Sequence, residues 1–141
     1  MQIYLKEKAK RMNRESNIQC NFVKAFRVIY PDLSLLLFAI PNGSSRNKLE
    51  AFRLKREGVV KGVADMILML PRCGFHALCL EFKRKEDYIG VGGKVCTRKT
   101  YQSAEQVAWQ KAVEEQGYKY CVVYSVDDAL SVVRKYINEE L

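Results

Sequence analysis

The sequence predicts an α/β domain, and three observations support that fold class. Apolar runs of strand length occur at 35–40, 64–70, 76–83 and 119–125, and segments with a helical spacing of apolar residues lie before, between and after them. The chain has 141 residues, of which 48% are hydrophobic, and this is enough for one core. No proline-rich or glycine-rich linker and no internal repeat interrupts it, so we expect a single domain over residues 1–141.

The first helix and the first strand are predicted in the opening third of the chain. Apolar residues recur at helical spacing from Glu15 until Pro31 stops the pattern, and they are Ile18, Phe22, Ala25, Phe26 and Ile29. The run LLLFAI at 35–40 then predicts a buried strand. The turn-forming residues at 41–43, Pro-Asn-Gly, end it.

A second helix and a hairpin are predicted in the middle of the chain. The helix runs from Asn47 to Gly58, where the glycine is a C-terminal stop, and its apolar members are Leu49, Phe52 and Leu54. Two strands follow at 64–70 and 76–83. Because only a short turn at 71–74 joins them, they are expected to form an antiparallel hairpin.

The last third begins with a predicted loop. Residues 84–99 contain three glycines and a surplus of Lys and Arg. A helix at 101–116, a buried strand at 119–125 and a final helix at 127–139 follow, and Ser125 resembles the cap of the last helix. The inner face of that helix is marked by Leu130, Val133 and Ile137. This order of elements predicts one mixed sheet with helices around it.

The charge balance points to a polyanionic partner. Lys and Arg number 24 against 16 Asp and Glu, a formal net charge of +8. Composition alone does not separate nucleic acid from a membrane surface. No run approaches the ~18 apolar residues of a membrane span, and the N-terminal segment lacks the apolar stretch of a secretory signal. We therefore expect no membrane partner.

The cysteines argue against zinc and against disulfides. There are five of them, no two are spaced as CxxC, and His76 is the only histidine. A reducing, cytoplasmic compartment fits this usage. Cys79 and Cys121 lie in apolar runs, so both are expected to pack as small hydrophobic residues.

The informative constellation is formed by Asp65, Glu81 and Lys83. Side chains alternate along a strand, so Glu81 and Lys83 point to one face and Phe82 to the other. Asp65 opens the first strand of the predicted hairpin and Glu81 closes the second, and these two ends are neighbours in an antiparallel pair. Two carboxylates and one ammonium are therefore expected to converge at one end of the sheet.

Such a trio suits phosphodiester hydrolysis. Two carboxylates hold Mg²⁺ in part and leave positions for water and phosphate oxygens, and the backbone carbonyl of Phe82 is a further expected ligand. Lys83 then orients the attacking water and offsets negative charge in the transition state. The alternative is structural, with Lys83 in a plain ion pair with Glu81 or Asp65.

Several motifs together resemble the virus-type replication-repair nuclease (VRR-NUC) domain of the PD-(D/E)xK superfamily. The resemblance covers most of the chain, from Glu15 to about Ser125. Its motifs are Glu15 with Gln19, FAIPNG (38–43) with Arg46, AFRLKREGVVKGVAD (51–65), LEFK (80–83), SAEQ (103–106) with Trp109, and Gly117. Ala64 departs from the pattern, because the superfamily name implies proline there. Since that proline contacts no metal, little effect is expected.

The resemblance implies a restriction-endonuclease-like core with a central mixed β-sheet flanked by α-helices. It implies a DNA endonuclease dependent on Mg²⁺, with Mn²⁺ able to substitute, and with Asp65, Glu81 and Lys83 as catalytic residues. Glu15 would be an additional metal ligand and Gln106 a further catalytic-site residue. Stand-alone members resemble phage-encoded homodimers that act on branched DNA such as Holliday junctions, in a host or bacterial cytoplasm, and larger relatives serve DNA repair.

Each added residue has a structural alternative. Glu15 suits the positive end of a helix dipole, and Gln106 lies three residues after Ser103, which is the spacing of a capping box. Trp109 is expected in the core. Gln102 and Gln110 would face the site if the helix were rotated from the expected setting.

Basic residues near the predicted loop and the second helix are candidates for DNA contacts. Tyr88 and Tyr101 are candidates for stacking on exposed bases. Contacts to phosphates predict salt-sensitive binding that selects structure more than sequence. The main rival function is a catalytically silent DNA-binding module with the same fold, and the intact trio argues against it. The DNA-binding candidates are Arg46, Lys48, Arg84, Lys85, Lys94, Arg98 and Lys99.

Overall fold

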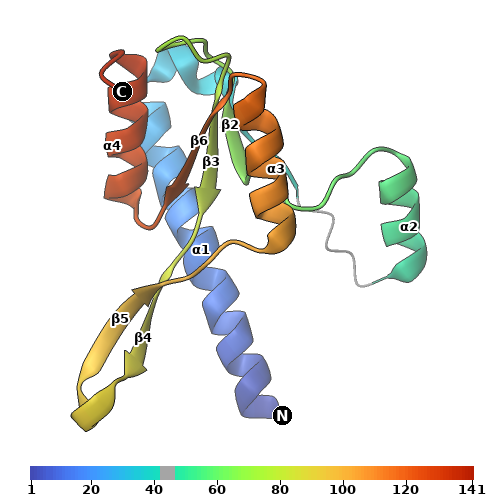
Figure 1. Ribbon diagram of the computed structural model, residues 1–141, viewed down its shortest axis with the longest axis vertical. Coiled ribbons are helices and arrows are strands. Elements are labelled where there is room, and N and C mark those ends of the chain that lie inside the picture. The colour runs from blue at the N-terminus through green and yellow to red at the C-terminus, as the bar shows by residue number, and fades with distance from the viewer. Residues whose placement is uncertain (42–46) are drawn as a thin grey trace. The chain divides into compact units, whose positions relative to one another are not determined.

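The chain combines α-helices and β-strands in an α/β fold, as the sequence predicts (Figure 1). The computed structural model describes residues 1–41 and 47–141, with the backbone alone at 4, 5, 7–14 and 87. None of the described helices combines the length and the hydropathy that a membrane span needs. The elements are α1 (Gln2–Ile29), the 3-10 helix η1 (Pro31–Leu36), β1 (Leu37–Ala39), α2 (Lys48–Arg56), β2 (Met66–Leu68), β3 (Leu78–Phe82), β4 (Lys85–Ile89), the 3-10 helix η2 (Val91–Gly93), β5 (Val95–Lys99), α3 (Ala104–Glu115), β6 (Lys119–Val123) and α4 (Val126–Ile137).

Four strands form a mixed sheet in the order β1-β2-β3-β6. β1 pairs with β2 and β2 pairs with β3, both antiparallel, so the predicted hairpin is confirmed. β6 runs parallel to β3, because their hydrogen bonds advance together along both strands. The Lys119 amide donates to the Ala77 carbonyl at 3.0 Å, and the Lys83 amide donates to the Val123 carbonyl at 2.9 Å.

The described chain divides into two units. The first consists of Met1–Leu35, Phe82–Tyr101 and Val122–Leu141, and the second of Leu36–Glu81 and Gln102–Cys121. In the first unit α1 packs against α4. Its aromatic core is built on Phe22, whose ring centroid lies 6.0 Å from that of Phe26 and 5.6 Å from that of Phe82. Burial of these rings holds α1 in place, since each removes a large apolar surface from water.

The core of the second unit comes from β2 and β3. Met66 and Leu68 on β2 and Leu78 and Leu80 on β3 are buried, and Ala64 is buried just before β2. All five residues of β3 are buried, and one of them is the charged Glu81. A strand buried over its whole length presents no exposed polar face, so Glu81 is an exception that calls for a partner.

Helix α1 is longer than its apolar pattern predicts. The pattern begins at Glu15, whereas the helix begins at Gln2. No glycine or proline occurs before Pro31, so nothing in the chain breaks the helix toward the N-terminus.

The prediction of a buried strand over 35–40 is wrong in its first part, and in the strand that does form only Leu37 is buried. Pro31 begins a 3-10 helix that runs to Leu36, and only Leu37–Ala39 forms a strand. Leu35 is 93% exposed. Proline fixes φ near the helical value, which favours a helical turn at this point over an extended chain.

The prediction of a loop over residues 84–99 is also wrong. β4 and β5 pair antiparallel from Lys85↔Lys99 to Ile89↔Val95, and the three glycines lie only at the tip, around Val91–Gly93. The glycines therefore mark the turn of a hairpin and not the whole segment.

Candidate active site

The register of β2 and β3 brings two carboxylates to one end of the pair. Met66 lies opposite Leu80, and Asp65 precedes Met66 by one residue while Glu81 follows Leu80 by one. Continued by one step, this register sets Asp65 opposite Glu81. Opposed residues in an antiparallel pair point to the same face, so the two carboxylates share a face at this strand end.

Glu81 is held in a buried position by an amide. Its side chain is only 2% exposed, and the Gln106 Nε2 donates a hydrogen bond to its Oε1. A buried carboxylate is costly unless hydrogen-bond donors replace the water that it loses. The α3 residue Gln106 supplies one such donor.

The same amide also caps α3. The Gln106 Oε1 accepts a hydrogen bond from the Ser103 amide at 2.9 Å, and the Gln106 amide donates to the Ser103 Oγ at 3.2 Å. This is a complete capping box. Of the two interpretations that the sequence leaves open for Gln106, the helix cap is therefore present, and a contact with Glu81 exists beside it.

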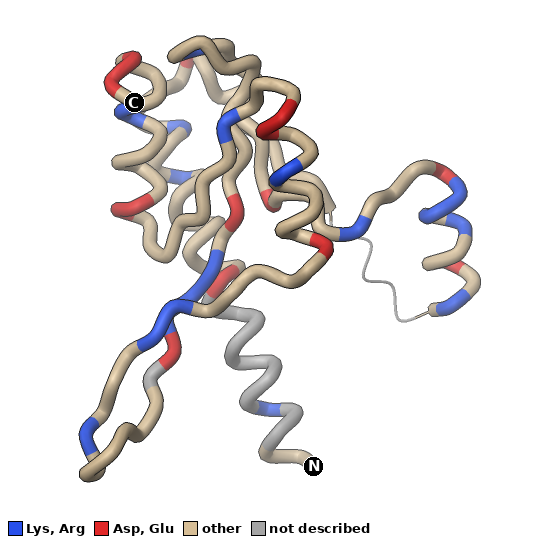
Figure 2. Tube along the Cα trace, viewed as in Figure 1, with Lys and Arg blue, Asp and Glu red and all other residues tan. Residues whose placement is uncertain are grey.

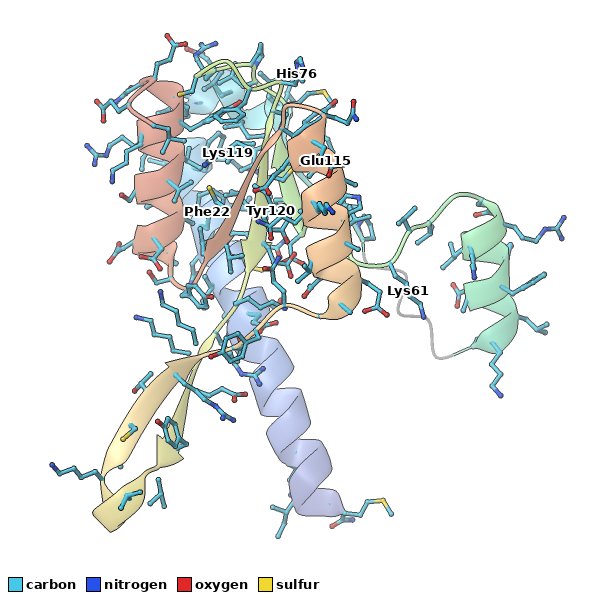
Figure 3. All side chains as sticks on the ribbon, in the orientation of Figure 1. Phe22, Lys61, His76, Glu115, Lys119 and Tyr120 are labelled. Carbon is cyan, nitrogen blue, oxygen red and sulfur yellow. The ribbon has the colours of Figure 1, made fainter. Side chains whose placement is uncertain are left out.

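Tyr120 lies on β6 and adds a hydroxyl to the surroundings of Glu81. Figure 3 shows Tyr120 beside α3. It is buried, and its hydroxyl accepts a hydrogen bond from the Gln102 Nε2 at 3.1 Å, while the same Nε2 donates to the Gln110 Oε1 at 3.0 Å. Burial raises the pKa of Tyr120, the nearby charge of Glu81 raises it further, the Gln102 hydrogen bond lowers it, and Asp65 adds to the rise. Tyr120 is therefore a neutral hydroxyl at physiological pH.

Sequence reasoning missed Tyr120. It lies in the apolar run 119–125, which predicts only a buried strand. The available signal is weak: a buried tyrosine hydroxyl usually finds a hydrogen-bond partner, so a tyrosine in a core strand indicates a polar neighbour without saying which one. Trp109, expected in the core, is half-buried with its ring centroid 6.1 Å from that of Tyr120.

Lys83 and Phe82 belong to the first unit. The Phe82 ring packs against Phe22, and the Lys83 amide donates to the Val123 carbonyl, so both residues are fixed through the backbone and the core. The Lys83 side chain is half-buried. It follows Glu81 by two residues in the sequence, which is the spacing of side chains on one face of a strand.

Glu15 lies in an ion-pair network in the first unit. The Arg84 Nη1 is 3.8 Å from the Glu15 Oε1, and the Arg84 Nη2 donates to the Glu86 Oε1. The Arg98 Nη2 lies 3.6 Å from the Glu86 Oε2. Among the DNA-binding candidates, Arg84 is therefore engaged by carboxylates within the protein.

The other candidates for DNA binding differ in their surroundings. Lys48, Lys85, Lys94 and Arg98 are exposed, and Figure 2 shows basic residues along the β4–β5 hairpin. The exposed Lys99 has its Nζ 4.7 Å from the centroid of the Tyr124 ring. Arg46 lies outside the described residues.

Comparison with known proteins identifies the fold. No family model matches the chain, and no curated protein matches it. A solved structure described as a VRR_NUC domain protein superimposes with a TM-score of 0.69 at 23% identity, over 88% of this chain and 88% of that one. The chain therefore shares the fold of that protein. The resemblance to the VRR-NUC domain that the sequence motifs predict is confirmed at the level of the fold.

Proposed function

We propose that this chain is a DNA endonuclease that depends on Mg²⁺ or Mn²⁺, with Asp65, Glu81 and Lys83 as its catalytic residues. One observation carries the proposal: the register of β2 and β3, continued by one residue beyond the pair Met66↔Leu80, sets Asp65 opposite Glu81, in a chain that shares the fold of a VRR_NUC domain protein. We take residues 1–141 as one nuclease domain.

The donor set fits a hard divalent cation. Asp65 and Glu81 offer carboxylate oxygens, and Mg²⁺ is usually bound by one or two carboxylates together with water and substrate phosphates. Within residues 1–41 and 47–141, no group of three His, Cys, Asp or Glu side chains forms a metal cluster by itself. Two carboxylates leave coordination positions for water and phosphate oxygens, which is the arrangement that Mg²⁺ prefers.

Each residue then has a distinct task. A bound cation supplies Lewis-acid stabilisation of the phosphate oxygens on which negative charge develops. Asp65 and Glu81 would hold it, with the Phe82 carbonyl as a further ligand, and Gln106 positions the Glu81 carboxylate through its hydrogen bond. The Lys83 ammonium offsets charge on the phosphate. Glu15 is a proposed further ligand on the family resemblance alone.

The proposed substrate is branched DNA of the Holliday-junction kind, cut by a homodimer in the cytoplasm of a bacterium or a phage-infected host. The net charge of +8 supports a polyanionic ligand. A dimer with two-fold symmetry would present two equivalent sites to a four-way junction. The order of the family motifs supports the branched substrate.

Cleavage of labelled DNA tests the proposal. The protein is incubated with a four-way junction, a flap and a linear duplex in Mg²⁺, Mn²⁺ or EDTA. We expect metal-dependent nicking that prefers branched substrates and falls by about 100-fold or more in Asp65→Asn and in Lys83→Ala.

The exposed Asp32→Asn and Lys135→Ala are the matched controls, and both should cleave like the wild type. Cleavage that survives either site variant removes that residue from the mechanism. DNA binding without cleavage in any metal would instead support the catalytically silent module.

A further inference from the structure

The β4–β5 hairpin carries an apolar tip that no described residue covers. Ile89 and Val95 lie opposite each other and are 79% and 74% exposed, and Val91 between them is fully exposed. Three β-branched side chains at the end of one hairpin form a concentrated apolar surface. We call Ile89, Val91 and Val95 the hairpin tip.

The two faces of the hairpin differ. On one face Arg98 lies 5.5 Å from the Tyr88 ring centroid and forms an ion pair with Glu86. At the base, the Thr100 amide and hydroxyl donate to the Arg84 carbonyl at 3.1 Å and 2.9 Å. These contacts hold the hairpin from its base and from one face, which matters because an isolated two-stranded hairpin is only marginally stable.

The opposite face combines the apolar tip with facing lysines. Lys85 pairs with Lys99, and by strand alternation both lie on the same face as Ile89 and Val95. Like charges directly opposite each other are unfavourable unless an anion lies between or beside them. Over the whole hairpin, four basic residues stand against Glu86 and Asp87.

We infer that the hairpin tip inserts between DNA bases at a branch point, with the lysines of the same face on the flanking phosphates. The inference rests on the proposed function in taking DNA as the ligand. Proteins that kink DNA insert apolar side chains between base steps, and the insertion is least costly where stacking is already interrupted. The tip would thereby favour branched over linear DNA without reading sequence.

A second copy of this chain is the rival occupant of the tip. An interface between copies at the tip would bring together two hairpins that each carry four basic residues against Glu86 and Asp87, so excess positive charges would face each other. A polyanion compensates them directly, so the charge complementarity favours DNA.

Fluorescence of 2-aminopurine placed at the crossover of a four-way junction tests the insertion. The measurement is made in EDTA, so that it does not depend on cleavage. Wild-type protein should raise the fluorescence, because the base loses its stacking partner. The variant Ile89→Thr/Val91→Ser/Val95→Thr should lose most of this rise and about tenfold of its junction affinity, with little change for linear duplex.

Threonine keeps the β-branched shape at the two strand positions, so the hairpin itself should persist. Leu35→Ser, which replaces an equally exposed apolar residue outside the hairpin, is the matched control and should behave like the wild type. Junction binding by the wild type without a fluorescence rise, or a rise that survives in the triple variant, overturns the inference.

Sedimentation of the same proteins measures their oligomeric state, which distinguishes DNA from a second copy of the chain as the ligand of the hairpin tip. If the triple variant changes from dimer to monomer, the tip contacts a second copy and the inference fails. Fluorescence that behaves as expected in a protein that cuts nothing in any metal would overturn the proposed function alone. Absence of all DNA binding would overturn both.

Discussion

Gln106 joins the stability of a helix to the geometry of the candidate site. Its Oε1 closes the capping box with the Ser103 amide, and its Nε2 donates to the buried Glu81. The Ser103 side chain serves only the cap, because its Oγ accepts from the Gln106 amide and the contact with Glu81 is made by Gln106. The two residues therefore allow the cap and the carboxylate contact to be separated.

Gln106→Ala is expected to impair cleavage more than Ser103→Ala does. Loss of the serine cap costs about 1 kcal/mol of the free energy of unfolding. The glutamine variant also leaves a buried carboxylate short of a donor, which costs about 1 to 3 kcal/mol more. Urea unfolding measures both losses of stability, and junction cleavage measures their effect on the reaction. Equal cleavage rates in the two variants would show that the Glu81 contact has no part in the reaction.

The buried thiol of Cys79 predicts that the free energy of unfolding falls at alkaline pH. Burial, with a smaller contribution from Cys121, raises the pKa of Cys79 from 9.0 to about 11. Because the folded pKa lies above the unfolded one, the contribution is complete below pH 9 and is lost as the pH rises toward 11. It amounts to about 2 to 3 kcal/mol at most.

Cys79→Ala should therefore lose less unfolding free energy between pH 9 and 11 than the wild type does. Urea unfolding at several pH values measures the difference. Cys20→Ala, at an exposed position, is the control and should follow the wild type. Parallel curves for Cys79→Ala and wild type would contradict this account of the thiol.

At the scale of the elements, the first turn of α3 depends on Gly62, whose backbone lies directly against it. Gly62 has φ +85°, and a Cβ there would lie 2.7 Å from the Gln106 nitrogen and closer still to the Glu105 carbonyl group. Only glycine allows this approach without moving the first turn of α3. Gly58 also has a positive φ, +101°, but has open space around it.

Gly62→Ala should consequently destabilise the protein by several kcal/mol and also displace Gln106, whereas Gly58→Ala should cost about 1 kcal/mol from backbone strain alone. Thermal unfolding measures the loss of stability in each variant, and because both replace glycine by alanine, the difference reports the close approach to α3. Equal losses of stability would mean that the close approach of residue 62 to α3 is absent in solution.

The elements that sequence predicts best are those whose side chains are buried on a regular period. The β2–β3 hairpin follows from two apolar runs and a short turn, and α4 begins at the predicted Ser125 cap, where the Oγ accepts from the Asp128 amide at 3.0 Å. The positions of Asp65 and Glu81 at neighbouring strand ends can be predicted from that hairpin, because the apolar runs set where its strands end.

The β4–β5 hairpin and the 3-10 helix η1 escape prediction for a related reason. Val95 and Ile89 are exposed, so no alternation of buried and exposed residues reveals the strands. Leu35 is likewise apolar and exposed, and the period of a 3-10 turn leaves no mark in a six-residue apolar run. Contacts made by long polar side chains, such as that of Gln102 with Tyr120, are not encoded in any local pattern.

For the whole molecule, the net charge of +8 predicts strongly salt-dependent DNA binding. The logarithm of the binding constant should fall linearly with the logarithm of the salt concentration, and Lys94→Ala should reduce the slope by about 0.9 if that exposed lysine contacts a phosphate. Lys135→Ala on α4 is the matched control and should leave the slope unchanged. A binding isotherm that is the same at low and moderate salt would rule out phosphate contacts as the main source of affinity.

Titration calorimetry with Mn²⁺ in the absence of DNA tests most directly whether Asp65 and Glu81 act together on one cation. We predict saturable binding by the wild type, weakened at least about tenfold in Asp65→Asn and equally in Glu81→Gln, and unchanged in the exposed Asp32→Asn. Wild-type affinity in both site variants would contradict a shared cation at this strand end and, with it, the proposed chemistry.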